Sequence, residues 1–314
     1  MQAIDALVEG VRKGDVRSVA RAITAVENGA PEATALLAAL FPHAGAARVI
    51  GVTGPPGAGK STLVDRMTTR LRAQGKTVGI IAVDPTSPFT GGAILGDRIR
   101  MQAHATDEGV FIRSMATRGH LGGLAAATGH VLTVLSASGK DVILVETVGV
   151  GQDEVEIVGT ADVSLVVLVP GLGDEVQALK AGIMEIADVF VINKADREGV
   201  DRVVAELHSM LSLAAHGEQP EIVQTVASSD QGTAEVLDAV ERYVARAGSS
   251  GVLAARKKAQ VRRLFEQTLQ ARLMERVRTR VLPEAEMARL VERLHGRELD
   301  PFAASEEVLG RLGL

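Results

Sequence analysis

Seven short apolar runs recur between residues 48 and 226, and longer stretches with helical spacing separate them. The runs are RVIGVT, TVGIIAV, VFIR, DVILVE, VSLVVLV, DVFVIN and EIVQTV, and most are apolar at successive positions rather than at alternate ones. Continuous apolar runs are typical of strands buried on both faces of a parallel sheet, whose faces helices must cover. We therefore expect an α/β fold with a mostly parallel central sheet flanked by helices.

Helical spacing dominates the chain on both sides of this region. In residues 2–40 apolar positions recur every three or four residues, with Gly14 and Asp15 as a break and N-cap between two helices. We interpret AGSSG at 247–251 as a linker. After it, an apolar stripe at four-residue spacing indicates a long helix whose apolar side must pack against another surface; the stripe consists of Val261, Phe265, Leu269, Leu273 and Val277. The sequence thus predicts a helical extension at 1–47, an α/β domain at 48–250 and a helical arm at 251–314.

A glycine-rich segment lies directly between the first apolar run and a helical stretch. It consists of Gly54, Pro55, Pro56, Gly57, Ala58, Gly59, Lys60 and Ser61, with Thr62 next along the helix. The segment fits the pattern GxxxxGK[ST], in which glycines let backbone N–H groups turn toward phosphates at a helix N-terminus. Lys60 would reach the β- and γ-phosphates, and Ser61 would coordinate magnesium. We therefore expect these residues to bind a nucleoside triphosphate and Mg²⁺.

A second motif, NKAD at residues 193–196, follows another apolar run and fits the pattern NKxD. In this pattern the Asp carboxylate accepts hydrogen bonds from the N1–H and the 2-amino group of guanine, and adenine offers no such pair. The wrong base would leave a buried charge unpaired. Asn193, Lys194 and Asp196 are therefore our candidates for guanine recognition, which makes GTP and GDP the expected nucleotides. The plainer alternative is a polar helix cap after a strand.

Glu146 closes the run DVILVE, and Gly149 follows it three residues later. Nucleotide-binding folds place a magnesium-linked carboxylate and a glycine that senses the γ-phosphate at this position. The side chain of Glu is longer than the usual Asp, which leaves open whether its metal contact is direct or through water. Because Val150 follows Gly149, no Gln stands there to orient the attacking water, and we predict slow intrinsic hydrolysis. Gln152 is either a substitute or a solvated loop residue.

Two aspartates lie at or beyond the end of the run TVGIIAV. Asp84 opens the segment DPTSP, and Asp97 lies in GGAILGDRIRM. The carboxyl ends of strands are where α/β sheets place ligands. Each carboxylate therefore either joins the magnesium site or positions water, or else is only a turn or cap residue.

Composition excludes several classes of site and partner. The chain has no Cys, which rules out disulfides, iron–sulfur clusters and thiolate metal sites, and its seven His lack ligand spacing. A net charge of −5 with few aromatic residues gives no footprint for nucleic acid. No apolar run approaches the roughly 18 residues of a membrane span, and the first residues do not form a signal peptide. We expect a cytoplasmic protein with neither nucleic acid nor a membrane as partner.

Two further segments are rich in cationic side chains. Residues 113–123 hold two Arg, one His and three Gly in a loop before a helix. An arginine finger in cis is one interpretation, but we favour a loop that packs against the nucleotide domain or a partner. The cluster of Arg256, Lys257, Lys258, Arg262 and Arg263 suggests contact with acidic lipid or nucleic acid, or, as we prefer, a solvated helix face.

Several segments, taken in order, resemble one family. GPPGAGKS, VDPTSPFTGGAILGDRIRM, FIRSMATRGHLGG, ETVGVGQ, PGLGDEVQALKAGIMEIAD and NKAD are similar to the MeaB/ArgK-type P-loop GTPases, and the resemblance covers nearly the whole chain. Members of that family, which includes the methylmalonic aciduria type A protein, are chaperones of adenosylcobalamin-dependent acyl-CoA mutases such as methylmalonyl-CoA mutase. The resemblance implies a GTPase that gates loading of the cofactor into such a mutase and its protection or reactivation, and it makes 48–250 the GTPase domain.

The resemblance also assigns residues. It implies that magnesium lies among Ser61, Asp84, Asp97 and Glu146, and that nucleotide-dependent loops occupy 84–97, 146–154 and 171–180. In the third loop Lys180 becomes a candidate for coupling partner binding to hydrolysis.

Other features of the family concern the base and the dimer. Relatives often read Ser-Ala in the last guanine loop, and this chain has Val226-Ala227 instead. The backbone N–H of Ala227 can still meet the guanine carbonyl, so the departure puts only a side-chain role in doubt. The C-terminal helices of the family form a homodimer arm, which would explain the apolar stripe at 261–277.

Two other functions compete with this one. A metal-insertion GTPase of the hydrogenase or urease maturation kind shares the fold, but such proteins hold their metal through Cys or clustered His. A kinase acting on a periplasmic amino-acid carrier is a description attached to relatives, and the NKAD motif gives it little support.

Overall fold

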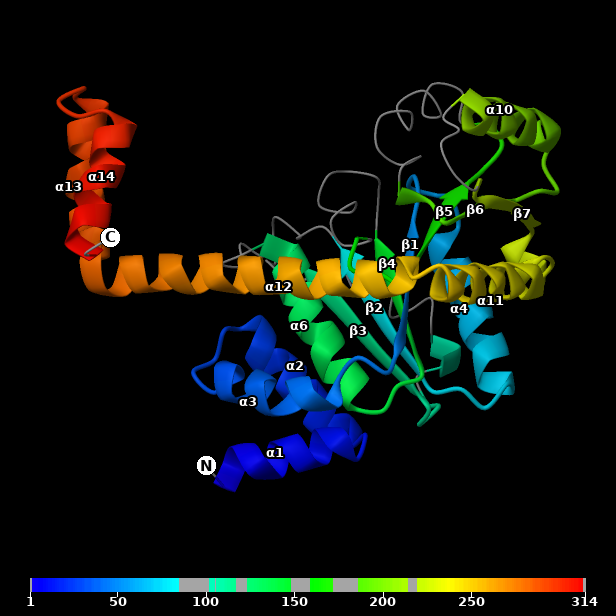
Figure 1. The fold of residues 1–314 in the computed structure, drawn as a ribbon. Coiled ribbons are helices and arrows are strands. Elements are labelled where there is room, and N and C mark those ends of the chain that lie inside the picture. The colour runs from blue at the N-terminus through cyan, green and yellow to red at the C-terminus, as the bar shows by residue number, and fades with distance from the viewer. Residues whose placement is uncertain are drawn as a thin grey trace.

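The computed structural model describes residues 2–84, 102–104, 106–116, 123–147, 159–171, 186–213 and 219–312. Its centre is a seven-stranded sheet in the order β3-β2-β4-β1-β5-β6-β7, and every pair of neighbouring strands is parallel (Figure 1). The α/β class and the parallel sheet predicted from the apolar runs are confirmed, because each run contributes one strand.

The strands are short, and the central ones are buried, whereas the edge strands β3 and β7 are only partly buried. The seven strands are β1 (Arg48–Thr53), β2 (Val78–Asp84), β3 (Val110–Ala116), β4 (Val142–Thr147), β5 (Val163–Leu168), β6 (Val189–Asn193) and β7 (Glu221–Thr225). Successive residues enter opposite cores: Leu144 packs in one cluster and its neighbours Ile143 and Val145 pack in the other. The sheet is therefore covered on both faces.

Helices cover both faces of this sheet. One core lies under α4 (Lys60–Ala73) and α11 (Thr233–Ser249). The opposite core lies under α6 (Gly123–Ala137), and a smaller one joins β5 and β6 to α10 (Val200–Leu213). Among the described residues this part of the fold also contains the short 3-10 helices η1 (Phe41–His43), η2 (Gln102–His104) and η4 (Ala227–Ser229).

The predicted N-terminal helices form a further layer on α6. They are α1 (Gln2–Arg12), α2 (Val16–Glu27) and α3 (Ala33–Leu40), and Asp15 caps α2 through a 2.8 Å bond from the Ser18 N–H to its carboxylate. Their apolar faces share one core with α6 and with β2, β3 and β4. The extension is thus part of the packed body rather than an appendage, and Gly14 and Asp15 form the predicted break.

The C-terminal helices leave the body (Figure 1). Helix α12 (Val252–Arg276) is straight, has no buried residue, and continues through the π-helical turn η5 (Val277–Val281) to α13 (Glu284–His295) and α14 (Pro301–Leu312). The linker predicted at 247–251 is mostly wrong: α11 continues to Ser249, so only Ser250 and Gly251 separate the two helices. Ala and Ser tolerate helical conformation, and Gly251 with φ 79° supplies the break.

Four residues of the predicted apolar stripe remain open on this arm. Val261, Phe265, Leu269 and Leu273 are 54, 64, 46 and 44% exposed. Within the described ranges, none of the helices combines the length and the hydropathy that a membrane crossing requires.

Candidate nucleotide site

The glycine-rich segment turns from the carboxyl end of β1 into α4. Three glycines have positive φ, with 144° at Gly54, 75° at Gly57 and 88° at Gly59. Lys60 is 5% exposed, and its Nζ donates to the carbonyl oxygens of Gly54 at 2.7 Å and Pro55 at 3.0 Å. The ammonium group at the end of the loop thus bonds to the two carbonyls at its beginning. Phosphate oxygens could replace these carbonyl acceptors.

Two of the glycines are also required by close neighbours. A Cβ at Gly54 would lie 2.1 Å from the carbonyl oxygen of Val167 on β5, and a Cβ at Gly59 would lie 2.3 Å from Nδ2 of Asn193 on β6. Backbone and a bonded amide cannot move aside cheaply, so the loop can sit this close to β5 and β6 only as glycine.

The phosphate loop and the first turn of α4 are exposed at several positions. Gly59 is the N-cap and has no side chain with which to cap the helix, while Pro56, Gly57 and Thr62 are exposed. An N-terminus of this kind is suited to anions, since its N–H groups and the helix dipole both favour negative charge. The arrangement agrees with a phosphate site at residues 54–62.

A hydroxyl and a carboxylate meet beside this loop. Ser61 is 8% exposed and Glu146, at the end of β4, is 6% exposed, and Ser61 Oγ donates to Glu146 Oε1 at 2.6 Å. Both groups supply the oxygen atoms that Mg²⁺ prefers. The donor set therefore fits a magnesium ion, although the assignment of its ligands remains a prediction.

The other predicted ligands cannot be compared with this pair. Asp84 ends β2 next to β4, but its side chain is outside the described atoms, and Asp97, Gly149, Gln152 and Lys180 lie outside the described residues. Across the ranges that the structure does describe, no three His, Asp or Glu side chains gather as a metal site would require. Ser61 and Glu146 alone represent the predicted magnesium site.

Asn193 organises the edge where the base is expected. Its Nδ2 donates to the Ala58 carbonyl at 2.8 Å, and its Oδ1 accepts from Thr225 Oγ1 and from the Ala227 N–H, both at 3.1 Å. One amide thus connects the phosphate loop with the loop after β7. Asn193 is 2% exposed, so these bonds are sheltered from water.

The remaining NKAD residues take up distinct positions. Lys194 has φ 57° and donates from Nζ to the Gly57 carbonyl at 2.7 Å, while Asp196 is exposed. The structure therefore brings Lys194 to the phosphate loop and leaves the Asp196 carboxylate open to a ligand. The Ala227 N–H already serves Asn193, so a guanine carbonyl would share this donor or take the next one.

Several contacts around the site carry no sequence signal. Thr147 Oγ1 donates to Thr53 Oγ1 at 2.9 Å and joins the ends of β4 and β1, and His104 Nε2 lies 3.1 Å from Asp65 Oδ1 on α4. A single Thr or Asp reveals nothing of its partner when they are far apart in the chain. Only the strand order could have placed Thr53 beside Thr147.

Arg113 makes a structural contact. It lies on β3 and forms an ion pair with Glu27 of α2, and its Nη2 donates to Thr24 Oγ1 at 3.3 Å. The predicted loop is therefore wrong for residues 113–116, which belong to β3, and Arg113 contacts the N-terminal extension rather than the nucleotide domain or a partner. Arg118 and His120 lie outside the described residues.

The opposite, amino-terminal edge of the sheet anchors the arm. Arg256 of α12 forms a bidentate pair with the buried Asp188, at 2.5 and 2.8 Å, and Nη1 donates to the Asp162 carbonyl at 2.8 Å. Burial and a hydrogen bond to Asp188 raise the pKa of Tyr243, so that the phenol stays neutral. The guanidinium of Arg256 lies 5.6 Å from the Tyr243 ring centroid.

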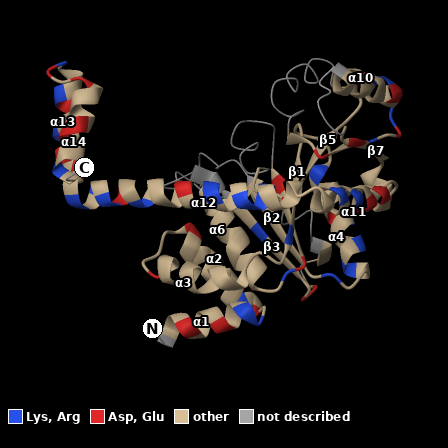
Figure 2. Ribbon diagram, viewed as in Figure 1, with Lys and Arg blue, Asp and Glu red and all other residues tan. Residues whose placement is uncertain are grey.

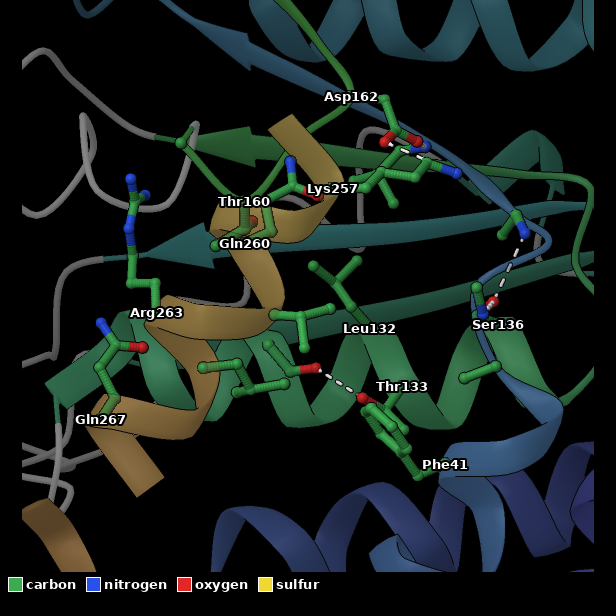
Figure 3. Close-up of a pocket in the computed structure, with 18 residues that line it drawn as sticks. Phe41, Leu132, Thr133, Ser136, Thr160, Asp162, Lys257, Gln260, Arg263 and Gln267 are labelled. Atoms are coloured by element: carbon green, nitrogen blue, oxygen red, sulfur yellow. Dashed lines mark hydrogen bonds and ion pairs between the residues drawn. The ribbon is translucent and has the colours of Figure 1, made fainter. Parts of the chain in front are cut away.

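A groove follows this anchor between α12, α6 and η1 (Figure 3). Its volume is about 290 Å³, and its walls include Phe41, Leu132 and Leu264, with Lys257 and Arg263 also lining it. Figure 3 shows Phe41 beside Thr133 and Lys257 beside Asp162. Because Lys257 and Arg263 are exposed, the groove combines apolar walls with cationic residues at its border.

Comparison with known families matches most of this chain. Residues 19–281 match the family described as methylmalonyl-CoA mutase-associated GTPase MeaB. A protein from Pyrococcus horikoshii that is named as a GTPase is 47% identical over 317 residues, which cover 99% of each chain. The GTPase ArgK of Escherichia coli is 38% identical over 257 residues, or 78% of this chain and 77% of ArgK.

A mammalian relative and a solved structure extend the comparison. The mouse mitochondrial methylmalonic aciduria type A homolog is 31% identical over 326 residues, which cover 98% of this chain and 79% of that protein. A crystal structure of a protein described as an LAO/AO transport system kinase aligns with a TM-score of 0.71 and 25% identity, covering 100% of this chain and 99% of the other. With its family match and its relatives named as GTPases, the chain belongs to the MeaB family of P-loop GTPases and hydrolyses GTP.

Proposed function

We propose that this GTPase is a chaperone of an adenosylcobalamin-dependent acyl-CoA mutase of the methylmalonyl-CoA mutase type. GTP state would set the affinity for the mutase, and hydrolysis would gate the loading of the cofactor and its protection or reactivation. The observation that carries this proposal is the match of residues 19–281 to a family described as mutase-associated. The relative named for methylmalonic aciduria supports the same client.

The described residues suggest how the chain handles GTP. Lys60 would exchange its bonds to Gly54 and Pro55 for the β- and γ-phosphates, and the amides of residues 57–62 would add neutral donors. Ser61 and Glu146 would hold Mg²⁺, and the 2.6 Å hydrogen bond between Ser61 Oγ and Glu146 Oε1 supports this assignment because the two oxygens are neighbours. Magnesium bound there would offset the charge that develops on the phosphate oxygens.

Four further residues belong to this proposal on sequence grounds. Asp84 and Asp97 would complete the metal site, Gly149 would sense the γ-phosphate, and Lys180 would couple partner binding to turnover. Because Val150 follows Gly149, we propose slow hydrolysis by the free protein. The cytoplasm, as predicted from the sequence, is the proposed location.

We further propose that the arm makes the protein a homodimer. Its exposed apolar side chains lie on α12, as Phe265 does, and on the terminal pair of helices, where Phe302 is 84% exposed. Figure 2 shows that Lys and Arg prevail along α12, which carries seven of them against two Glu. Helices α13 and α14 together carry five Glu and three Arg. Charge therefore favours contact between α13 and α14 of one copy and the groove between α12, α6 and η1 of another, which Lys257 and Arg263 border.

Light scattering tests the dimer with single substitutions. Phe265→Asp and Phe302→Asp should each give a monomer, because a charge would be buried without a partner. Val16→Asp is the control, since Val16 is 50% exposed on α2, away from the arm. If Phe265→Asp and Phe302→Asp both remain dimeric, the dimer interface does not lie on the arm.

Cofactor loading tests the chaperone role directly. The cognate mutase, stripped of cofactor, would be mixed with adenosylcobalamin and this protein in the presence of GTP, GDP or a non-hydrolysable GTP analogue. We expect the rate or extent of holo-mutase formation to depend on the nucleotide, and Lys60→Ala to abolish that dependence. Identical loading with every nucleotide would contradict the proposal.

A metal-insertion role is the weaker alternative. It would require delivery ligands, and the chain has no Cys. For the kinase activity in the description of the matched structure, transfer of the labelled γ-phosphate from GTP to a protein acceptor would be the positive result.

A further inference from the structure

Helix α4, which begins at the phosphate loop, carries two Arg–Asp pairs to different segments. Arg70 pairs with Asp230, in the loop after β7, and Arg72 pairs with Asp107, after η2. Both pairs are partly exposed and join residues far apart in the chain. The first pair touches the loop in which the base contact is expected, and the second does not.

The Arg70 guanidinium binds both the carboxylate and the backbone carbonyl of Asp230. Its Nε donates to Oδ1 at 3.0 Å, and its Nη2 lies 2.8 Å from Oδ2 and 3.2 Å from the Asp230 carbonyl oxygen. Asp230 is one of three non-glycine residues with positive φ in the part of the chain described, at 59°. A guanidinium that binds carboxylate and carbonyl together fixes both the position and the conformation of this residue.

Charge at Asp230 supports this contact. Partial burial by itself would raise the pKa of the Asp230 carboxyl, but hydrogen bonds from Arg70 and Thr233, with the nearby charges of Arg70 and Arg66, lower it overall. The carboxylate is thus ionised at neutral pH. Arg66, one turn before Arg70, adds a long 3.5 Å contact to the Ser228 carbonyl.

The rest of the loop is fixed from the other side. Asn193 Oδ1 accepts from Thr225 and Ala227, and Val226 and Gln231 form an antiparallel bridge through 3.0 and 3.2 Å bonds. The turn of η4 therefore lies between two clamps, Asn193 and Arg70. Its amides are the donors expected to meet the guanine carbonyl.

We propose that Arg70 is a positioning residue for guanine recognition, acting through Asp230 to hold residues 227–230 at a fixed distance from the phosphate-binding end of α4. One rigid helix then sets the position of both the phosphate site and the carbonyl-reading turn. Arg70 touches neither phosphate nor base in this arrangement. Its effect is on which base the loop accepts.

Nucleotide analogues separate this role from a general effect on folding. Inosine triphosphate lacks the 2-amino group, which Asp196 is expected to read. The triphosphate of 2-aminopurine riboside lacks the carbonyl, which the turn is expected to read, and also the N1–H, whose loss at Asp196 is common to the wild type and the Arg70 variant. Arg70→Met keeps the aliphatic stem and removes the guanidinium. Arg72→Met is the matched control, because Arg72 has the same kind of partner on the same helix.

We expect Arg70→Met to raise the Kd of GTP about three- to ten-fold, as for a partly exposed charged pair, with kcat at saturating GTP little changed. The Kd of the 2-aminopurine nucleotide should rise far less, so preference for GTP over it falls, whereas preference for GTP over inosine triphosphate stays as in the wild type. Arg72→Met should change neither ratio, and Arg70→Lys should restore part of the first.

Two further results bear on the mechanism. Asp230→Asn tolerates the positive φ and should reproduce the effect in part, and adding it to Arg70→Met should cause little further loss, because the two act as one unit. An unchanged ratio of GTP to the 2-aminopurine nucleotide in Arg70→Met would overturn the proposal. Equal losses of that ratio in Arg72→Met would also overturn it, since they would show a general loosening of α4.

Discussion

The two edges of the sheet are held together by different chemistry. At the carboxyl edge, side chains bond to backbone carbonyls of the phosphate loop, as Lys60 does with Gly54 and Asn193 with Ala58. At the amino edge, the buried carboxylates of Asp162 and Asp188 accept backbone N–H groups of neighbouring strands, and Arg256 of the arm donates to the Asp188 carboxylate and to the backbone carbonyl of Asp162. Groups at the carboxyl edge can exchange these hydrogen bonds for bonds to a ligand. Groups at the amino edge use theirs to hold α12 in place.

This difference implies that substitutions at the two edges separate binding from architecture. Changes at the carboxyl edge should alter nucleotide binding with modest effect on stability. Changes at the amino edge should lower stability or alter the arm while nucleotide affinity persists.

The largest effect is expected for Lys60→Ala. The side chain is 5% exposed and is the buried cation of the phosphate loop, so its loss should weaken GTP binding about 100-fold or more. Isothermal titration with GTP measures the change, and Lys76→Ala, an exposed lysine just beyond α4, is the control. Near wild-type affinity in Lys60→Ala would remove the phosphate-loop assignment.

Base choice gives the next largest effect. Asp196→Asn removes the acceptor of the guanine N1–H, so preference should move from GTP toward xanthosine triphosphate, on the order of 100-fold in the ratio of Kd values. Asp201→Asn, at an exposed position on α10, should leave the ratio as it is. Retained selectivity for GTP in Asp196→Asn would defeat the base-reading assignment.

At the amino edge, Arg256→Met should lower the free energy of unfolding by about 2 kcal/mol, because it leaves buried Asp188 without its cation. The Kd of GTP should change less than about two-fold. Urea unfolding and GTP titration on one preparation compare the two quantities. Arg262→Met, whose partner is the exposed Glu266, is the control. A large rise in the Kd of GTP would show that the edges are not separable.

The smallest effect concerns pH and the contact between α6 and α12. Burial lowers the pKa of His130 below its ordinary 6.5, and its Nε2 lies 3.2 Å from Thr268 Oγ1 on α12. Above 6.5 the ring is neutral in both states; below 6.5 the unfolded chain binds a proton first, so stability falls as pH drops toward the lowered pKa. His130→Gln should flatten this part of the pH profile of urea midpoints. Equal slopes in both proteins would exclude His130 as the cause.

Short-range features of the fold were predictable from the sequence. Continuous apolar runs gave all seven strands, and the GPPGAGKS and NKAD segments lie at the carboxyl ends of β1 and β6. Motifs of this kind are visible because a ligand dictates neighbouring residues. The linker at 247–251 was predicted wrongly because small residues do not by themselves end a helix, and α11 continues to Ser249.

Long-range pairs were beyond the reach of the sequence. Arg70 and Asp230 are 160 positions apart, and Arg113 and Glu27 are 86 apart. One chain contains many Arg and Asp residues, and only the strand order and the packing of helices select the pairs. The same holds for Arg256 with Asp188, which appeared in the sequence only as part of a basic cluster.

The central claim is that a mutase client controls this GTPase, and its turnover tests that claim most directly. GTP hydrolysis would be measured for the protein alone and with a cognate adenosylcobalamin-dependent acyl-CoA mutase, with ATP as the control nucleotide. We predict slow hydrolysis of GTP alone, strong stimulation by the mutase, and no turnover of ATP under either condition. Unchanged GTP hydrolysis, together with no complex between the two proteins, would contradict the account.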